Sequence, residues 1–319
     1  MKKKLMALLM TVLMVVGLVG CGGGNNGELI KVGIINLDSS ESGYRTANNN
    51  DLKNRFTEAN GYDASFFYSM SNDEQVAQAQ KFIQDGVDYL LLSAADTSGW
   101  DAVLKDAQAA GVSVILFDRV IDASDDLYAA SVVSDMVKEG QTAVEWLKAQ
   151  NLSEYNIIHI QGTIGSSAQI GRTQAVNEAV EKDGWKLVTQ QGAEWSEEKA
   201  QQIVQSVIDS GESFNVIYAE NDGMARGAVA ALDKAGITHG IDGDVVIMGF
   251  DCNKFALQAV WDGEWNYDGQ CNPFQSEIID GIIKKLEKGE TLPEKVIYLE
   301  EKGFDKSNMT EGDIEKYGI

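Results

Sequence analysis

The sequence predicts an α/β protein made of two similar lobes, each a doubly wound domain around a parallel β-sheet. From Glu28 onward, short apolar runs rich in Val, Ile and Phe alternate with longer amphipathic stretches, which is typical of repeated strand–helix units. This succession occurs twice, once in each half of the chain. The 319 residues are 44% hydrophobic and 24% charged, enough to build two separate hydrophobic cores.

The first half contains five strand candidates, rich in β-branched and aromatic residues. They lie at residues 30–37, 64–69, 88–93, 112–117 and 127–133. Helices are expected at 47–60, 73–84 and 100–110, because apolar residues recur there at three- and four-residue spacing. Gly111 ends the third helix, since glycine readily adopts the left-handed conformation that follows a helix.

The second half repeats the pattern, again with helical stretches between the strands. Its strand candidates lie at residues 155–162, 185–192, 214–220, 244–250 and 264–270. Two series of the same kind predict two lobes of the same architecture. The two prolines, Pro273 and Pro293, fall outside these runs, where we expect the chain to cross between lobes.

The N-terminus has the pattern of an exported protein. Residues 1–20 place three lysines ahead of an apolar run that is too short for a resident membrane span, as in a secretory signal peptide. The sequence Leu-Val-Gly-Cys at 18–21 resembles the lipobox of bacterial lipoproteins, which predicts lipidation of Cys21. An ordinary signal peptide with an incidental cysteine is the alternative. Residues 21–28 would form a flexible tether that holds the exported, lipid-anchored body about 15 Å from the outer face of the cell membrane, and a periplasmic location is the alternative.

The charge balance excludes nucleic acid as a partner. The chain has 26 basic and 49 acidic residues, a net charge of −23, and loss of the three lysines at 2–4 with the signal peptide leaves −26. So acidic a body is repelled by phosphate backbones.

Two cysteines remain once Cys21 carries a lipid. Cys252 and Cys271 each follow a predicted strand, and a pair of thiols in an exported protein can oxidise. The sequence therefore allows either a disulfide between them or two buried thiols.

Polar and aromatic residues recur just after the predicted strands. In open α/β sheets the ligand site lies beyond the carboxyl ends of the strands, so these residues are the candidate binding groups. They are Glu41, Tyr44, Arg45, Asp118, Arg119 and Asp135 in the first series, and Arg172, Trp195, Asn221, Asp251, Gln270 and Asn272 in the second.

This residue set matches the chemistry of a monosaccharide. Vicinal hydroxyls both donate and accept, and the planar side chains of Asp, Asn and Arg satisfy two of them at once. The C–H face of a sugar ring packs on an aromatic plate, which Tyr44 and Trp195 would supply from opposite lobes. The alternatives are a helix cap for Asp222, a solvated helical arginine for Arg172 and a surface aromatic for Trp195.

Six motifs resemble, in order and spacing, the sugar-binding proteins of the ribose and galactose class of ABC importers. The resemblance runs from Lys31 to Leu299 and is closest to galactofuranose-binding members. The motifs are ESGYR at 41–45, FDRVID at 117–122, VSDMVKEG at 133–140, QGTIGSSAQIGR at 161–172, YAENDGMARGA at 218–228 and GFD at 249–251.

The resemblance implies the type I periplasmic-binding-protein fold, in which the chain crosses three times between lobes that close on a sugar. Lobe 1 would comprise residues 29–134 and 271–295, and lobe 2 residues 135–270 and 296–319. The implied partners are a monosaccharide and an ABC permease with its cytoplasmic ATPase. The residues implied to bond sugar hydroxyls are Asp118, Arg119, Arg172, Asn221 and Asp251, with Tyr44 and Arg45 lining the first lobe and Trp195 stacking on the ring.

The chain departs from the ribose branch of this class at two places. The usual glutamine two residues before a proline is Cys271 here, flanked by Gln270 and Asn272, so the last contact stays unassigned. An aromatic doublet is replaced by Gly43 and Tyr44. These departures favour a sugar other than ribose, such as galactofuranose or a similar aldose.

Other functional classes fit the sequence less well. It contains no dinucleotide-binding glycine motif, nucleophile elbow or phosphate-binding loop, and His159 and His239 lack partners at catalytic or metal spacing. A sugar-responsive repressor would begin with a helix-turn-helix rather than a signal peptide. We therefore predict a monomeric binding protein, not an enzyme, with neither cofactor nor metal. A sensor that presents its closed form to a membrane receptor or kinase remains the alternative.

Overall fold

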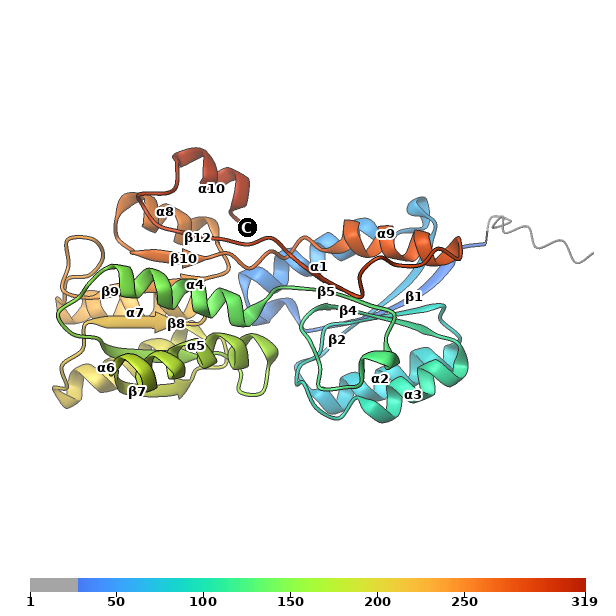
Figure 1. Cartoon of the computed structure of the whole chain (residues 1–319), viewed down its shortest axis with the longest axis horizontal. Coiled ribbons are helices and arrows are strands. Elements are labelled where there is room, and N and C mark those ends of the chain that lie inside the picture. Colours follow the sequence, from blue (N-terminus) through green and yellow to red (C-terminus); the bar gives the residue numbers. More distant parts are fainter. Residues whose placement is uncertain (1–27) are drawn as a thin grey trace, which may run out of the picture.

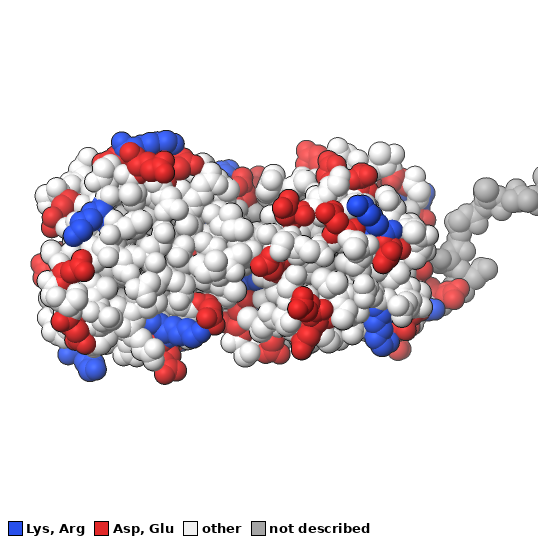
Figure 2. Space-filling view, turned by 90° about the horizontal axis from the view of Figure 1, so that it is seen from below, with Lys and Arg blue, Asp and Glu red and all other residues white. Residues whose placement is uncertain are grey.

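The computed structural model describes residues 28–319, which form two lobes side by side (Figure 1). The predicted signal peptide, Cys21 and the tether as far as residue 27 lie outside the described residues. Between residues 28 and 319, no helix combines the length and apolar content needed to cross a membrane. Acidic side chains are spread over both lobes on the face that Figure 2 shows.

Lobe 1 is built on a six-stranded parallel sheet in the order β11-β5-β4-β3-β1-β2. Leu91 faces one helical layer while Leu90 and Leu92 face the other, as expected for a sheet buried on both sides. The strands are β1 (Ile30–Asn36), β2 (Tyr62–Tyr68), β3 (Tyr89–Leu92), β4 (Ser113–Asp118), β5 (Ala130–Val133) and β11 (Val296–Tyr298). Helices α1 (Gly43–Arg55) and α9 (Ser276–Glu287) cover one face, and α2 (Asn72–Asp85) and α3 (Asp101–Ala110) cover the other.

Lobe 2 repeats this architecture in the order β12-β10-β9-β8-β6-β7, with the edge strand β12 antiparallel to β10. The strands are β6 (Asn156–Gln161), β7 (Lys186–Gly192), β8 (Val216–Ala219), β9 (Val246–Phe250), β10 (Tyr267–Gly269) and β12 (Gly303–Phe304). Helices α4 (Met136–Ala149) and α5 (Ser167–Asp183) cover one face. Helices α6 (Glu197–Ser210), α7 (Asp222–Ala235), α8 (Lys254–Asp262) and α10 (Glu311–Tyr317) pack on the other.

All ten predicted strands and the three predicted helices are present, which confirms the α/β fold class. Helix α1 begins earlier than the predicted residue 47, because the Ser42 hydroxyl accepts a hydrogen bond from the Arg45 amide at 3.1 Å and caps the helix. This cap places Tyr44 and Arg45 in the first helical turn. The edge strands β11 and β12 were not predicted, since three and two residues carry too little periodicity to indicate a strand.

Three segments carry the chain between the lobes, after β5, β10 and β11 (Figure 1). Strand β11 pairs with β5 in the first sheet, so the third crossing follows Tyr298 rather than residue 295, where the predicted boundary lies. The Glu301 carboxyl group joins all three segments, because Oε1 accepts from the Ser134 hydroxyl and from the Asn272 amide, each at 2.6 Å. This carboxyl group is the centre of the hinge.

Substitution of Gly33 tests how tightly α2 packs on the sheet of lobe 1. A Cβ at Gly33 would stand 2.6 Å from the Phe82 ring, so Gly33→Ala should lower the free energy of unfolding by about 1–3 kcal/mol through overpacking. Gly281→Ala is the matched control, because it adds a Cβ into open space on α9 and should raise stability by up to about 1 kcal/mol. Urea unfolding followed by circular dichroism measures both, and equal shifts for the two variants would contradict this packing.

Candidate functional site

A small cavity lies between the lobes, at the carboxyl ends of the central strands. Its volume is about 20 Å³, roughly the space of one water molecule. Both lobes contribute to its wall, which confirms that the strand ends converge. The lining residues are Glu41, Ser42, Tyr44, Arg45, Asp118 and Arg119 from lobe 1, and Met136, Ala168, Arg172, Trp195, Asn221, Asp251 and Cys271 from lobe 2 and the second crossing.

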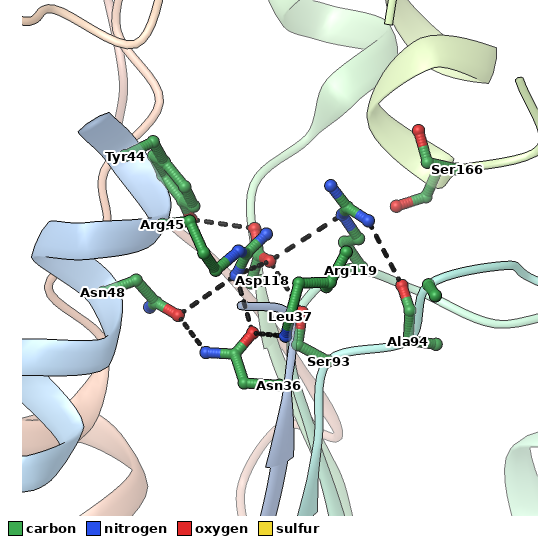
Figure 3. A network of polar contacts seen from close by, with 12 residues as sticks. Asn36, Leu37, Tyr44, Arg45, Asn48, Ser93, Ala94, Asp118, Arg119 and Ser166 are labelled. Carbon is green, nitrogen blue, oxygen red and sulfur yellow. Dashed lines mark hydrogen bonds and ion pairs between the residues drawn. The ribbon is translucent and has the colours of Figure 1, made fainter. Parts of the chain in front are cut away.

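Asp118 is the centre of the polar network in lobe 1 (Figure 3). Its carboxylate accepts hydrogen bonds from the Tyr44 hydroxyl at 2.8 Å and the Ser93 hydroxyl at 2.7 Å, and it forms an ion pair with Arg45 Nη1 at 2.7 Å. Burial alone would raise the pKa of Asp118, but the charges of Arg45 and Arg119 hold it below its ordinary value. Asp118 is therefore a buried carboxylate that keeps its charge at neutral pH.

Two arginines complete the lobe 1 side of the cavity. Arg45 Nε pairs with Glu41 Oε2 at 2.9 Å, and Arg119 Nη2 pairs with the other oxygen of the same carboxylate at 2.8 Å. The Arg119 guanidinium also reaches across the cavity, 5.9 Å from the centre of the Trp195 ring of lobe 2. Arg119 is thus a direct link between the two lobes.

Arg172 has the corresponding place in lobe 2. Its Nε pairs with Glu139 Oε2 at 2.7 Å, its Nη2 lies 3.5 Å from Asp251 Oδ1, and its Nη1 donates to the Glu220 carbonyl. Burial raises the pKa of Asp251 well above its ordinary value, although Arg172 opposes this shift. With only 2% of its surface exposed, Arg172 is not the solvated helical arginine of the alternative prediction.

Backbone conformation directs three site residues into the cavity. Asp118, Trp195 and Asp251 have φ angles of 60°, 62° and 108°, in the left-handed region that side chains other than glycine seldom adopt. Such strain is typical of functional positions, where the surrounding structure enforces it. Trp195 is 6% exposed, so the surface-aromatic alternative is wrong for this residue.

Asn221, and not Asp222, is the N-cap of α7. Its Oδ1 accepts from the Met224 amide at 2.8 Å, so its Nδ2 group is the part of the side chain left for a ligand. The Asp222 side chain turns away from the helix and accepts from the Asn253 amide at 2.7 Å. The alternative of a helix cap at Asp222 is therefore wrong by one residue.

Three predicted residues lie at the hinge and not at the cavity wall. Asp135 caps α4 by accepting from the Lys138 amide at 3.0 Å, and Asn272 Oδ1 accepts from the Phe274 amide at 3.0 Å. Gln270 lines a separate hollow beside β10. Successive side chains of an extended segment point in opposite directions, so Cys271 faces the cavity while Gln270 and Asn272 face away.

Glu139 is a site residue that the sequence analysis missed. Its side chain is 4% exposed and neutralises Arg172 from the first turn of α4. A buried arginine requires an acidic partner, and Glu139 stands within the quoted motif VSDMVKEG, so the signal was available. Burial and the charge of Glu139 raise the pKa of Glu301 to about 9, so the Glu301 carboxyl group keeps its proton at neutral pH.

Cys252 and Cys271 are free, buried thiols, which is the second of the two alternatives that the sequence allows. Cys252 packs within the lobe 2 core, while Cys271 belongs to the second crossing, where its sulfur lies 3.6 Å from the Ser134 hydroxyl. Burial raises the pKa of each thiol well above its ordinary value, which keeps both groups protonated and unreactive.

A larger hollow opens beside the cavity. Its volume is about 580 Å³, and its wall shares Glu41, Ser42, Trp195 and Asn221 with the small cavity. The remaining wall residues come from both lobes, among them Met70 and Phe255. This hollow therefore lies between the two lobes and borders the small cavity.

Comparisons with known proteins assign the chain to a family. The family model of the periplasmic binding protein domain matches residues 32–289. The fructose import binding protein of Bifidobacterium longum is 31% identical over 322 residues, covering 97% of this chain and 96% of that protein. The galactofuranose-binding protein of Escherichia coli is 31% identical over 264 residues, covering 81% and 82%.

A solved structure agrees with this assignment. The binding protein of the arabinose ABC transporter of Shewanella sp. ANA-3, bound to L-arabinofuranose, superposes with a TM-score of 0.82 at 27% identity, covering 90% of this chain and 95% of that one. These relatives are binding proteins, and this chain is likewise a binding protein rather than an enzyme. The family match and the two-lobed fold together show that the chain belongs to the periplasmic binding protein family.

Proposed function

We propose that this protein captures a monosaccharide between its lobes and delivers it to an ABC importer. The observation that carries the proposal is the convergence of two buried polar networks on one cavity, centred on Asp118 in lobe 1 and on Arg172 in lobe 2. Paired carboxylates and guanidiniums offer acceptors and donors at fixed positions, which suits vicinal hydroxyls. The Trp195 ring supplies an apolar plate for the C–H face of the sugar.

The cavity size implies that the lobes open to admit a ligand. A space of about 20 Å³ is far too small for a sugar ring, so Arg119 and Trp195, which meet across it, must separate. A sugar that bonds both lobes has a higher affinity for the closed form, and this difference drives closure. The permease would then recognise the closed surface.

Two of the three relatives described above support an aldofuranose, whereas the Bifidobacterium longum relative is named for fructose, a ketose. The Escherichia coli relative is named for galactofuranose, and the Shewanella structure contains arabinofuranose. The substitution of Gly43 and Tyr44 for an aromatic doublet supports a ligand other than ribose. We therefore propose galactofuranose or a similar aldose as the ligand.

The proposed setting is the outer face of the cell membrane. Export agrees with the family, and the lipobox-like sequence at 18–21 supports a lipid anchor at Cys21. A monomer anchored in this way remains near its permease while the tether lets the lobes reach it.

A ligand screen tests the proposed function directly. We expect a rise in melting temperature with a pentose or hexose that adopts a furanose ring, because binding to the folded state alone stabilises it. Thermal-shift assays over pentoses and hexoses, followed by calorimetry on each positive, make the measurement. The proposal fails if no monosaccharide shifts the transition.

Asp118 and Asp251 test whether both lobes bind the sugar. Asp118→Ala and Asp251→Ala each leave a buried arginine with one fewer partner and remove an acceptor, so each should weaken sugar binding by about 2–5 kcal/mol in calorimetry. Asp106→Ala is the control, since Asp106 is exposed on α3. Unchanged affinity in either cleft variant would remove that lobe's carboxylate from the binding site.

The anchor is tested through Cys21. Cys21→Ser removes the sulfur that would carry the lipid, so the exported protein should move from the membrane fraction to the soluble fraction. Cell fractionation with immunodetection measures this, and Cys252→Ser is the control thiol. Retention of Cys21→Ser at the membrane would rule out this anchor.

A further inference from the structure

Two buried carboxyl groups of lobe 2 lie behind the cleft and are not part of the cavity wall. Asp222 is the first residue of α7 and Asp268 the middle residue of β10, and both are 0% exposed. Among the described residues, Asp222 Oδ1 and Asp268 Oδ2 have no hydrogen-bond partner. A buried acceptor without a donor is costly, so the two oxygens require an explanation.

The two unpartnered oxygens belong to side chains that meet. Gly249 of β9 pairs in register with Asp268, and a Cβ at Gly249 would stand 2.5 Å from Asp222 Oδ1. Because Gly249 has no side chain, there is room at this position for the Asp222 carboxyl group beside Asp268. Asp268 and Asp222 Oδ1 therefore lie on the same face of β9 and β10, and each carboxyl group influences the pKa of the other as a hydrogen-bond partner.

The other oxygen of each carboxyl group holds the loop that presents Asp251. Asp222 Oδ2 accepts from the backbone amide of Asn253 at 2.7 Å and from its Nδ2 at 3.1 Å, while Asp268 Oδ1 accepts from the Cys252 amide at 3.4 Å. Asp251 and Cys252 have φ angles of 108° and 58°, so this loop is strained and needs such support.

We infer that Asp222 and Asp268 share a proton, which lies between Oδ1 of Asp222 and Oδ2 of Asp268, and that this acid pair is a positioning device that holds Asp251 in the cleft. The shared proton gives both unpartnered oxygens a hydrogen bond at once. The inference about Asp251 rests on the proposed function, whereas the shared proton does not.

The electrostatics of the pair agree with this assignment. Burial, followed by the charge of Asp268, raises the pKa of Asp222 well above its ordinary value, and burial raises the pKa of Asp268 to about 8. The other titratable groups that face the pair are Asp251, Arg172, Cys252 and Tyr267. The hydrogen bonds from Asp222 and from the Cys252 amide and the charge of Arg172 oppose the upward shift of the pKa of Asp268.

The shared proton makes folding pH-dependent with a defined sign. An unfolded aspartate loses its proton near pH 4, whereas the folded pair keeps it, so the folded state binds the extra proton above about pH 4. The equilibrium constant for folding should therefore fall about tenfold per pH unit for this proton between about pH 4 and 8. Stability contributed by the pair is lost as the pH rises.

Asparagine variants separate a shared proton from ordinary polar packing. In Asp222→Asn, the amide group donates to Asp268 and its oxygen still accepts from Asn253, so no proton is needed. Asp268→Asn works in the same way with the roles exchanged. The double variant places two amide NH₂ groups against each other unless one backbone bond is lost, so it cannot satisfy both partners.

The test measures urea unfolding from pH 5 to 8 and sugar affinity by calorimetry for the wild type, both single variants and the double variant. We expect each single variant to bind within about threefold of the wild type and to lose the tenfold-per-unit slope in folding, and the double variant to bind at least tenfold more weakly than either. Glu301 and Asp251 also contribute slopes, but both residues are present in every variant, so the change in slope between a variant and the wild type reports on the Asp222–Asp268 pair.

The outcomes distinguish this inference from the proposed function. Unchanged pH slopes in the single variants, or a double variant that binds no worse than the single ones, would overturn the shared proton and its positioning role. A wild type that binds no monosaccharide, together with flattened slopes in the single variants, would overturn the proposed function while the acid pair stands.

Discussion

The rest of the site depends on one constraint, the pairing of three arginines buried between the lobes. A buried guanidinium without a carboxylate would cost several kcal/mol, so each arginine brings acidic partners into the cleft. Arg45 and Arg119 share Glu41, and Arg172 lies between Glu139 and Asp251. The same pairs form an ordered array of donors and acceptors, and a dry cleft strengthens each of these interactions.

The hinge is connected to this array through one side chain. Glu301 joins the three crossing segments by accepting from Ser134 and Asn272, and burial together with the charge of Glu139, which pairs with Arg172, raises its pKa to about 9. A ligand that displaces Arg172 therefore alters the partner of a hinge residue. The Asp222–Asp268 pair supports the loop of Asp251 in a similar way. The two cleft residues Arg172 and Asp251 therefore each lie next to buried carboxyl groups with raised pKa values.

Much of the fold could be predicted from the sequence because its signals are local. Apolar runs in the β strands and amphipathic spacing in the helices depend on neighbouring residues, so ten strands and the two-lobed α/β class were identified correctly. The candidate binding residues were chosen by the rule that ligands bind beyond the carboxyl ends of parallel strands, and nine of the twelve line the cavity. The edge strands β11 and β12 were missed because pairing, and not composition, defines them.

The sequence by itself determined the exported pattern, the acidic charge, the fold class and the residue types of the site. Only the tertiary structure decided which side chains meet, because contacts such as Arg172 with Glu139 or Asp222 with Asp268 join residues far apart in the chain. It also decided that Cys271 faces the cavity while Gln270 and Asn272 do not, since the direction of a side chain depends on how the crossing segment is oriented against both lobes. Burial, which sets the charge state of these groups, exists only in the folded chain.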